Sequence, residues 1–209
     1  LGRKDLEQSV YFVAMVPAQI AFQLALIPAI LMALAIVREK ELGSIVNLYV
    51  TPVSRLEFLL GKQLPYIALA LVSACTMVLM MVLLFGVPVR GSLAALALGI
   101  LLYVASTTAL GLVISTFVRS QLAAIVASSI INVIPAVNFS GFMSPTSGLT
   151  GGARIAGAMF PARYFQSISV GAVTKGLSFA ELFPNLLALA GFAIVLVLAA
   201  SRLLPAQER

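Results

Sequence analysis

The sequence predicts an all-α membrane protein, and the two observations that predict it are its composition and the distribution of its charges. Of the 209 residues, 61% are hydrophobic and 10% are charged, whereas a soluble domain has roughly 45–50% apolar and about 25% charged residues. The charges fall in short clusters that leave long uncharged windows, and about 20 apolar residues cross a bilayer as a helix. We therefore expect five membrane-spanning helices. They are predicted at residues 9–37, 61–85, 92–117, 121–142 and 183–204.

Composition also excludes several kinds of chemistry. The chain has no histidine and one cysteine, Cys75, which excludes imidazole catalysis, an intrachain disulfide and a thiolate metal cluster. No stretch matches the phosphate-binding G-x-x-x-x-G-K-[ST] loop. The net charge of +6 comes from basic residues at the ends of apolar windows, where they anchor helices at lipid headgroups. We therefore expect no catalytic residue, no metal site and no direct contact with nucleic acid.

The first predicted span, residues 9–37, is longer than a bilayer requires. It would measure about 45 Å as a helix, against roughly 30 Å for the apolar core of a bilayer, so it must tilt, kink or protrude. Pro17 and Pro28 can kink it, because each removes a backbone donor. Residues 1–8 hold four charged side chains and are interpreted as the end of a polar region.

A charged segment, residues 38–60, follows the first span. Residues 44–51 are predicted to form a short amphipathic helix outside the membrane. Its apolar positions at helical spacing are Ile45, Leu48 and Tyr49. Ser54 and Glu57 match a capping box, so a new helix begins there and enters the bilayer after Lys62.

The later connections differ in length. Arg119 marks a very tight turn, whereas residues 143–182 are rich in Gly and Ser and contain apolar pieces too short to span. Within them, residues 160–174 have the composition of a short helix, with Arg163 near its start. Short apolar helices between spans are typical of re-entrant or interfacial segments.

The basic residues predict an orientation. The 38–62 connection, the Arg119 turn and the C-terminal end together hold seven Lys and Arg, while the other connections hold six over a longer length of chain. By the positive-inside rule, we expect the first group on the cytoplasmic side.

Several stretches resemble those of ABC-2 type transporter permeases, in the order expected for that family. They include VREKELGS at 37–44, LGKQLPY at 60–66, FGVPVRGS at 85–92, ISTFVRSQ at 114–121, SGFMSP at 140–145 and FPARYF at 160–165. The Phe-Pro-Ala at 160–162 departs from the Asn-Pro-Leu that the family more often has. With residues 166–171 and 174–179, it also resembles the membrane part of fused ribosome-associated ATPase/transporter proteins, and both subgroups remain open.

The resemblance implies spans two to six of a six-span permease, with residues 1–8 ending an extracytoplasmic region. It implies the permease component of an ATP-binding cassette exporter in the bacterial cytoplasmic (inner) membrane, driven by ATP hydrolysis on a separate subunit or domain. The alternative is a membrane anchor of a ribosome-associated ATPase without transport of its own. The chain itself would be no enzyme and bind no cofactor, since ATP and Mg would be held by the partner ATPase.

The implied partners are an ABC nucleotide-binding domain or subunit, a second permease copy or paralogue, the lipid bilayer and, as a further option, a periplasmic adaptor. Drug-like amphiphiles, lipids and polysaccharides are all open as substrates. Polar residues within the spans can either line a path or bond helix to helix. Those residues are Gln19, Gln23, Thr107, Ser128, Asn132 and Asn138.

Two groups of residues are candidates for function. Residues 38–62 are charged, helical and joined to two spans, and the resemblance assigns to this place the coupling helix that docks on the ATPase. The expected coupling residues are Arg38, Glu39, Lys40, Glu41, Gly43, Ile45 and Leu48. A solvated juxtamembrane charge cluster is the alternative.

The second group belongs, by the resemblance, to a re-entrant helix pair or gate on the extracytoplasmic side. Its members are Pro161, Arg163, Tyr164 and Phe165. For Arg163, an anchor that extends to the membrane interface is the alternative, because a guanidinium near the membrane needs water or a partner.

Overall fold

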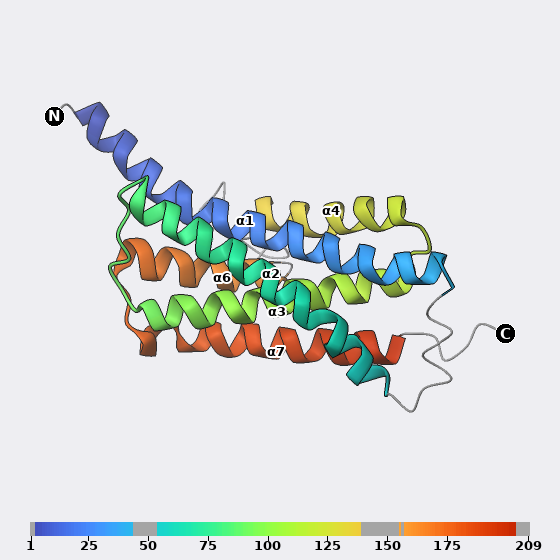
Figure 1. Ribbon diagram of the computed structural model, residues 1–209. Coiled ribbons are helices and arrows are strands. Elements are labelled where there is room, and N and C mark those ends of the chain that lie inside the picture. Colours follow the sequence, from blue (N-terminus) through green and yellow to red (C-terminus); the bar gives the residue numbers. More distant parts are fainter. Residues whose placement is uncertain (1–2, 44–53, 139–154, 156, 204–209) are drawn as a thin grey trace.

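The computed structural model describes residues 3–43, 54–138, 155 and 157–203, which form a bundle of helices without a strand in these ranges (Figure 1). The elements are α1 (Arg3–Glu41), α2 (Arg55–Leu83), α3 (Leu93–Phe117), α4 (Gln121–Asn138), α6 (Pro161–Val170), the π-helical turn η3 (Gly171–Lys175) and α7 (Phe179–Leu203). The all-helical class predicted from the sequence is confirmed.

Four of the described helices are long and apolar enough to cross a membrane. They are the Met15–Glu41 part of α1 and the whole of α2, α3 and α7. The remaining predicted span, residues 121–142, corresponds to α4, whose apolar part over Gln121–Ala136 is shorter than these four. Residues 139–142 lie outside the described part of the chain, so the fifth crossing stays a prediction.

Helix α1 is longer than the span predicted for it. It has 39 residues and continues through both Pro17 and Pro28, which makes it about 58 Å long at 1.5 Å per residue. Its N-terminal part extends beyond the other helices (Figure 1), as expected for a helix longer than the membrane is thick. At the other end, α1 passes the predicted boundary at Val37 and ends one turn later.

The helices alternate in direction, so the connections collect at two ends. The C-terminal ends of α1, α3 and α7 lie together with the starts of α2 and α4 (Figure 1). We call this the Arg119 end, after the turn between α3 and α4. The opposite end, called the Arg90 end, holds the α2–α3 connection and the turn between η3 and α7. The Arg119 turn and the Arg90 turn, which the charge count assigned to different sides, therefore lie at opposite ends of the described bundle.

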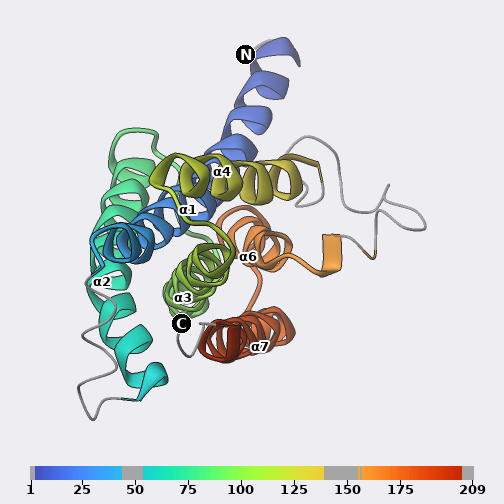
Figure 2. The same cartoon turned by 90° about the vertical axis from the view of Figure 1, so that its right-hand side faces the viewer.

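Helix α3 lies at the centre, with α1, α2, α6 and α7 around it and α4 outside α1 and α6 (Figure 2). Burial follows this arrangement: Tyr103 and Val104 of α3 are inaccessible, as are Phe165 of α6 and Leu189 of α7. Gly111 allows α3 to approach α1 closely, because a Cβ atom there would lie 2.4 Å from the carbonyl oxygen of Ala29. The backbones of α1 and α3 are therefore in direct contact.

Candidate functional site

The predicted coupling residues begin in the last turn of α1, at the Arg119 end. Successive residues of a helix project about 100° apart, so adjacent charges reach different neighbours. Glu39, Lys40 and Glu41 each contact a different helix. The sequence predicted this charge cluster, but not that α1 would distribute its charges among three helices.

Glu39 connects α1 to α2. Its carboxylate forms a salt bridge with Lys62, whose ammonium also lies 5.9 Å from the centre of the Phe58 ring. The start of α2 is fixed by the predicted capping box, which the structure confirms: the Ser54 N–H donates to Glu57 Oε2 at 2.8 Å and the Glu57 N–H donates to Ser54 Oγ at 3.3 Å. The cap thus sets where α2 begins and, with it, which turn carries Lys62.

Lys40 reaches the end of α3. Its ammonium donates to the carbonyl oxygens of Ser115 at 2.6 Å and Thr116 at 3.5 Å. These residues lie in the last turn of α3, where carbonyl groups have no partner within the helix. A cation there also complements the partial negative charge of a helix C-terminus, an effect typically worth about 0.3–1 kcal/mol.

Glu41 reaches the start of α4, which follows α3 after only three residues. Its carboxylate accepts the backbone N–H of Gln121 at 2.9 Å and a second hydrogen bond from the side-chain amide of the same residue. Ser120 Oγ accepts the N–H of Ala123 at 3.2 Å. Two of the N–H groups that α4 cannot satisfy internally are therefore bonded, one of them by α1.

The remaining coupling residues differ in position. Arg38 is exposed. Gly43 has a φ of 70°, and its N–H donates to the Lys40 carbonyl at 3.2 Å, so it ends α1 in the left-handed conformation that favours glycine. Ile45 and Leu48 lie outside the described residues, as does the predicted amphipathic helix at 44–51.

The second predicted group lies on α6, inside the bundle. Pro161 is the first residue of the helix, a position that needs no backbone donor. The Phe165 ring stacks on Tyr103, with centroids 4.3 Å apart and an interplanar angle of 6°, and Tyr164 lies 5.7 Å from Phe192 of α7. Arg163, which precedes Tyr164, is half-buried. All four predicted residues lie on one short helix, in which Pro161 and Phe165 are buried and Arg163 and Tyr164 are partly exposed.

The direction of α6 follows from its contacts. Tyr103, which Phe165 touches, is ten residues into α3, or about 15 Å from its start. Beyond α6, the Ala172 carbonyl of η3 accepts the N–H of Gly91 at 2.7 Å, next to the start of α3. Helix α6 therefore begins inside the bundle and runs outward to the Arg90 end. Helical structure predicted over residues 160–174 is confirmed, but the π-helical turn was not predicted.

Comparison with known proteins identifies the family of this chain. A family model described as "ABC-2 family transporter protein" matches residues 3–202. The chain belongs to the ABC-2 transporter family. The resemblance seen in the short sequence stretches is thus confirmed over nearly the whole chain.

Relatives of this ABC-2 chain include three Escherichia coli (strain K12) proteins. The probable multidrug ABC transporter permease YbhS is 34% identical over 152 residues, 73% of this chain and 40% of that protein. The inner membrane transport permease YhhJ is 27% identical over 169 residues, 79% of this chain and 44% of that protein. The probable multidrug permease YbhR is 28% identical over 134 residues, 64% of this chain and 36% of that protein. No solved structure matches the chain.

Family membership and the four apolar helices together show that this ABC-2 chain is a multi-pass membrane protein. The chain spans about two fifths of the length of the curated relatives it matches.

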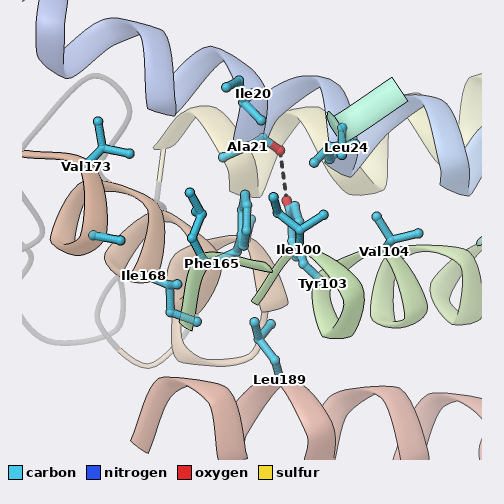
Figure 3. Close-up of a cluster of buried hydrophobic side chains, with 14 of the residues drawn as sticks. Ile20, Ala21, Leu24, Ile100, Tyr103, Val104, Phe165, Ile168, Val173 and Leu189 are labelled. Carbon is cyan, nitrogen blue, oxygen red and sulfur yellow. Dashed lines mark hydrogen bonds between the residues drawn. The ribbon is translucent and has the colours of Figure 1, made fainter. Parts of the chain in front are cut away.

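Sequence reasoning missed the central role of Tyr103 in this ABC-2 chain. Its hydroxyl donates to the Ala21 carbonyl of α1 at 3.0 Å while its ring stacks on Phe165, so it joins three helices (Figure 3). A buried tyrosine hydroxyl usually has a hydrogen-bond partner. The position of Tyr103 within an otherwise aliphatic span could therefore have indicated a contact between helices.

The polar residues within the spans are mostly satisfied by helix backbones. Thr107 donates to the Val104 carbonyl and Asn132 to the Ser128 carbonyl, each within its own helix. Gln63 instead links two helices, because its side-chain amide on α2 donates a hydrogen bond to Thr108 Oγ1 on α3 at 2.8 Å. Ser128 Oγ and Gln166 Oε1 are buried without a hydrogen-bond partner among the described residues, and the Asn138 side chain lies outside what is described.

Proposed function

We propose that this chain forms part of the permease of an ATP-binding cassette exporter, in which it carries a substrate across the bacterial inner membrane. The observation that carries the proposal is the family match over residues 3–202, supported by the four candidate spans. The three relatives are named permeases, and two of these names include multidrug transport. A drug-like amphiphile is therefore the first substrate class to test.

In this proposal the Arg119 end faces the cytoplasm. Six basic residues among the described positions lie there: Arg38, Lys40, Arg55, Lys62, Arg119 and Arg202. An excess of Lys and Arg is typical of the cytoplasmic side of short connections. The ATPase, which holds ATP and Mg, docks at this end as a separate subunit or domain.

The coupling segment begins at Arg38 and continues past Gly43 to the predicted amphipathic helix with Ile45 and Leu48. Support comes from its attachment, since the last turn of α1 contacts α2, α3 and α4 through Glu39, Lys40 and Glu41. A displacement of this segment by the ATPase would reach all three helices.

At the opposite end, α6 and η3 act as a re-entrant gate that faces a second permease copy or paralogue. Support comes from the depth at which Phe165 meets Tyr103 and from the attachment of Ala172 to Gly91 at the Arg90 end. In this gate Arg163 and Tyr164 border the exit for the substrate, Phe165 holds the helix against Tyr103 of α3, and Pro161 starts the helix that carries them.

The test uses the full-length protein with its partner ATPase in proteoliposomes and the cationic dye Hoechst 33342 as probe. We expect ATP-dependent loss of dye fluorescence, and no loss when the P-loop lysine of the ATPase is replaced. A fluorescent lipid and a labelled polysaccharide serve as second and third probes. ATP hydrolysis without vectorial movement of any of the three would overturn the permease proposal in favour of a membrane anchor.

A further inference from the structure

The charges in the last turn of α1 divide by what they contact. Arg38 is exposed, whereas Lys40 and Glu41 bond to the backbones of α3 and α4. We propose that Lys40 and Glu41 are positioning residues that hold the α3–α4 turn against α1, so that α1, α3 and α4 move together when the coupling segment is displaced. This rests on the proposed function, because an ATPase must displace the segment.

Both bonds go to groups that a helix leaves unpaired. Lys40 donates to the last carbonyls of α3, and Glu41 accepts from the first N–H of α4. Such groups carry the partial charges of the helix dipole, negative at the end of α3 and positive at the start of α4. We call Lys40, Glu41 and the turn of residues 118–120 the charged clamp.

The order of the two charges matches the order of the two helix ends. Lys40 and Glu41 are adjacent in sequence, and only three residues separate α3 from α4. Exchanging the two charges would place an anion on the carbonyls of α3 and a cation on the N–H group of α4. The net charge of the segment would stay the same, although both local interactions would become repulsive.

Apolar packing behind the charged clamp makes it part of a rigid contact. Ala33 and Val37 of α1 are buried against Ala124 of α4, and Val118 of the turn packs against the same cluster. Farther along, Gly111 brings the backbone of α3 onto Ala29. Helix α1 is therefore attached to both partners by packing as well as by charge, which is what transmission of a displacement requires.

The first test measures the charged clamp itself, by amide hydrogen exchange of the full-length protein in nanodiscs. K40E/E41K exchanges the charges, K40R keeps a cation with several donors, and R202Q removes a positive charge from α7 at the same end. We expect the amides of residues 121–124 to exchange at least tenfold faster in K40E/E41K, and within twofold of wild type in K40R and R202Q. Unchanged exchange in K40E/E41K would overturn the proposal.

The second test measures coupling with the partner ATPase and Hoechst 33342 in proteoliposomes. We expect K40E/E41K to retain the ATPase during purification and to move at least tenfold less dye per ATP hydrolysed. The K40R variant is expected to keep the wild-type ratio of dye moved to ATP hydrolysed. Loss of the ATPase from K40E/E41K would show docking rather than positioning, and an unchanged ratio would show no role in coupling. Either result overturns the proposal.

Single-charge variants keep the tests informative if K40E/E41K does not fold. K40Q and E41Q each remove one charge and retain a side chain that can hydrogen-bond, and we expect each to raise exchange and lower the dye-to-ATP ratio by a smaller factor. Absence of both effects in both variants contradicts the proposal. If wild type moves no dye, lipid or polysaccharide, the proposed function fails, while the exchange measurement still tests the charged clamp separately.

Discussion

Tyr103 brings together two interactions that can be separated by mutation. Its hydroxyl donates to the Ala21 carbonyl at 3.0 Å, and its ring stacks on Phe165. Tyr103→Phe removes only the hydrogen bond, which is worth about 0.5–1.5 kcal/mol. Tyr103→Leu also removes the stack, worth a further ~0.5–1.5 kcal/mol beyond the buried area. We expect thermal unfolding midpoints in detergent to fall in that order, and equal midpoints for the two variants would show that the stack contributes nothing.

Gly111 is required by the approach of two backbones. A Cβ atom there would lie 2.4 Å from the Ala29 carbonyl oxygen, so Gly111→Ala must separate α1 from α3. Overpacking of this kind typically costs about 1–3 kcal/mol, and we expect a lower unfolding midpoint. Gly191→Ala on α7 is the matched control, since no atom lies within 4 Å of its Cβ position. There, alanine should be neutral or stabilise the helix by up to about 1 kcal/mol. Equal effects of the two substitutions would contradict the backbone contact.

At the level of elements, the start of α2 depends on a local cap. Ser54→Ala removes the side-chain acceptor for the Glu57 N–H, and loss of such a cap typically costs about 1 kcal/mol. We expect faster hydrogen exchange of the amides of residues 55–58, with no change at the start of α3. Ser73→Ala is a suitable control, because that exposed hydroxyl donates to its own helix at the Leu69 carbonyl. Exchange that stays at the wild-type rate in Ser54→Ala would show that the cap does not hold the first turn.

The capping box could be predicted because its partners lie three residues apart, so the sequence alone brings them together. The contacts of the charged clamp could not be predicted in this way, because Lys40 and Ser115 are 75 residues apart in sequence and Glu41 and Gln121 are 80 apart. A sequence shows that these side chains are charged, but the helix ends next to them depend on tertiary packing. The sequence therefore predicts a charged coupling segment at Lys40 and Glu41, but not that α3 and α4 supply bonding partners for these side chains.

Helix boundaries also depend on tertiary contacts that the sequence does not show. The apolar pattern ends at Val37, yet α1 continues to Glu41, because the charged turn is supported by contacts with α2, α3 and α4. The π-helical turn of η3 also has no signal of its own in the sequence. Its Ala172 carbonyl accepts the N–H of the distant Gly91, and just after the turn the Leu177 carbonyl accepts the N–H of Ser92.

At the level of the molecule, the alternation of helix directions was predictable from the apolar windows and the tight turn at Arg119. The charge count assigned the Arg119 and Arg90 turns to different sides, and the structure places these two turns at opposite ends of the described bundle. Four of the five predicted crossings correspond to described helices long enough to span. The fifth stays a prediction, because residues 139–142 of the predicted span lie outside the described residues.

The two ends of the bundle should face opposite sides of the membrane. Leu42, which is 69% exposed, marks the Arg119 end, and the exposed Pro88 marks the Arg90 end. In full-length protein from which Cys75 and any other native cysteine have been removed, single cysteines at these positions can be treated with a membrane-impermeant maleimide. We expect Leu42→Cys to react only in inside-out vesicles and Pro88→Cys only in right-side-out vesicles, because the Arg119 end carries the cytoplasmic excess of basic residues. The reverse pattern would invert the proposed orientation, and reaction of both from one side would show that α2 does not cross the membrane.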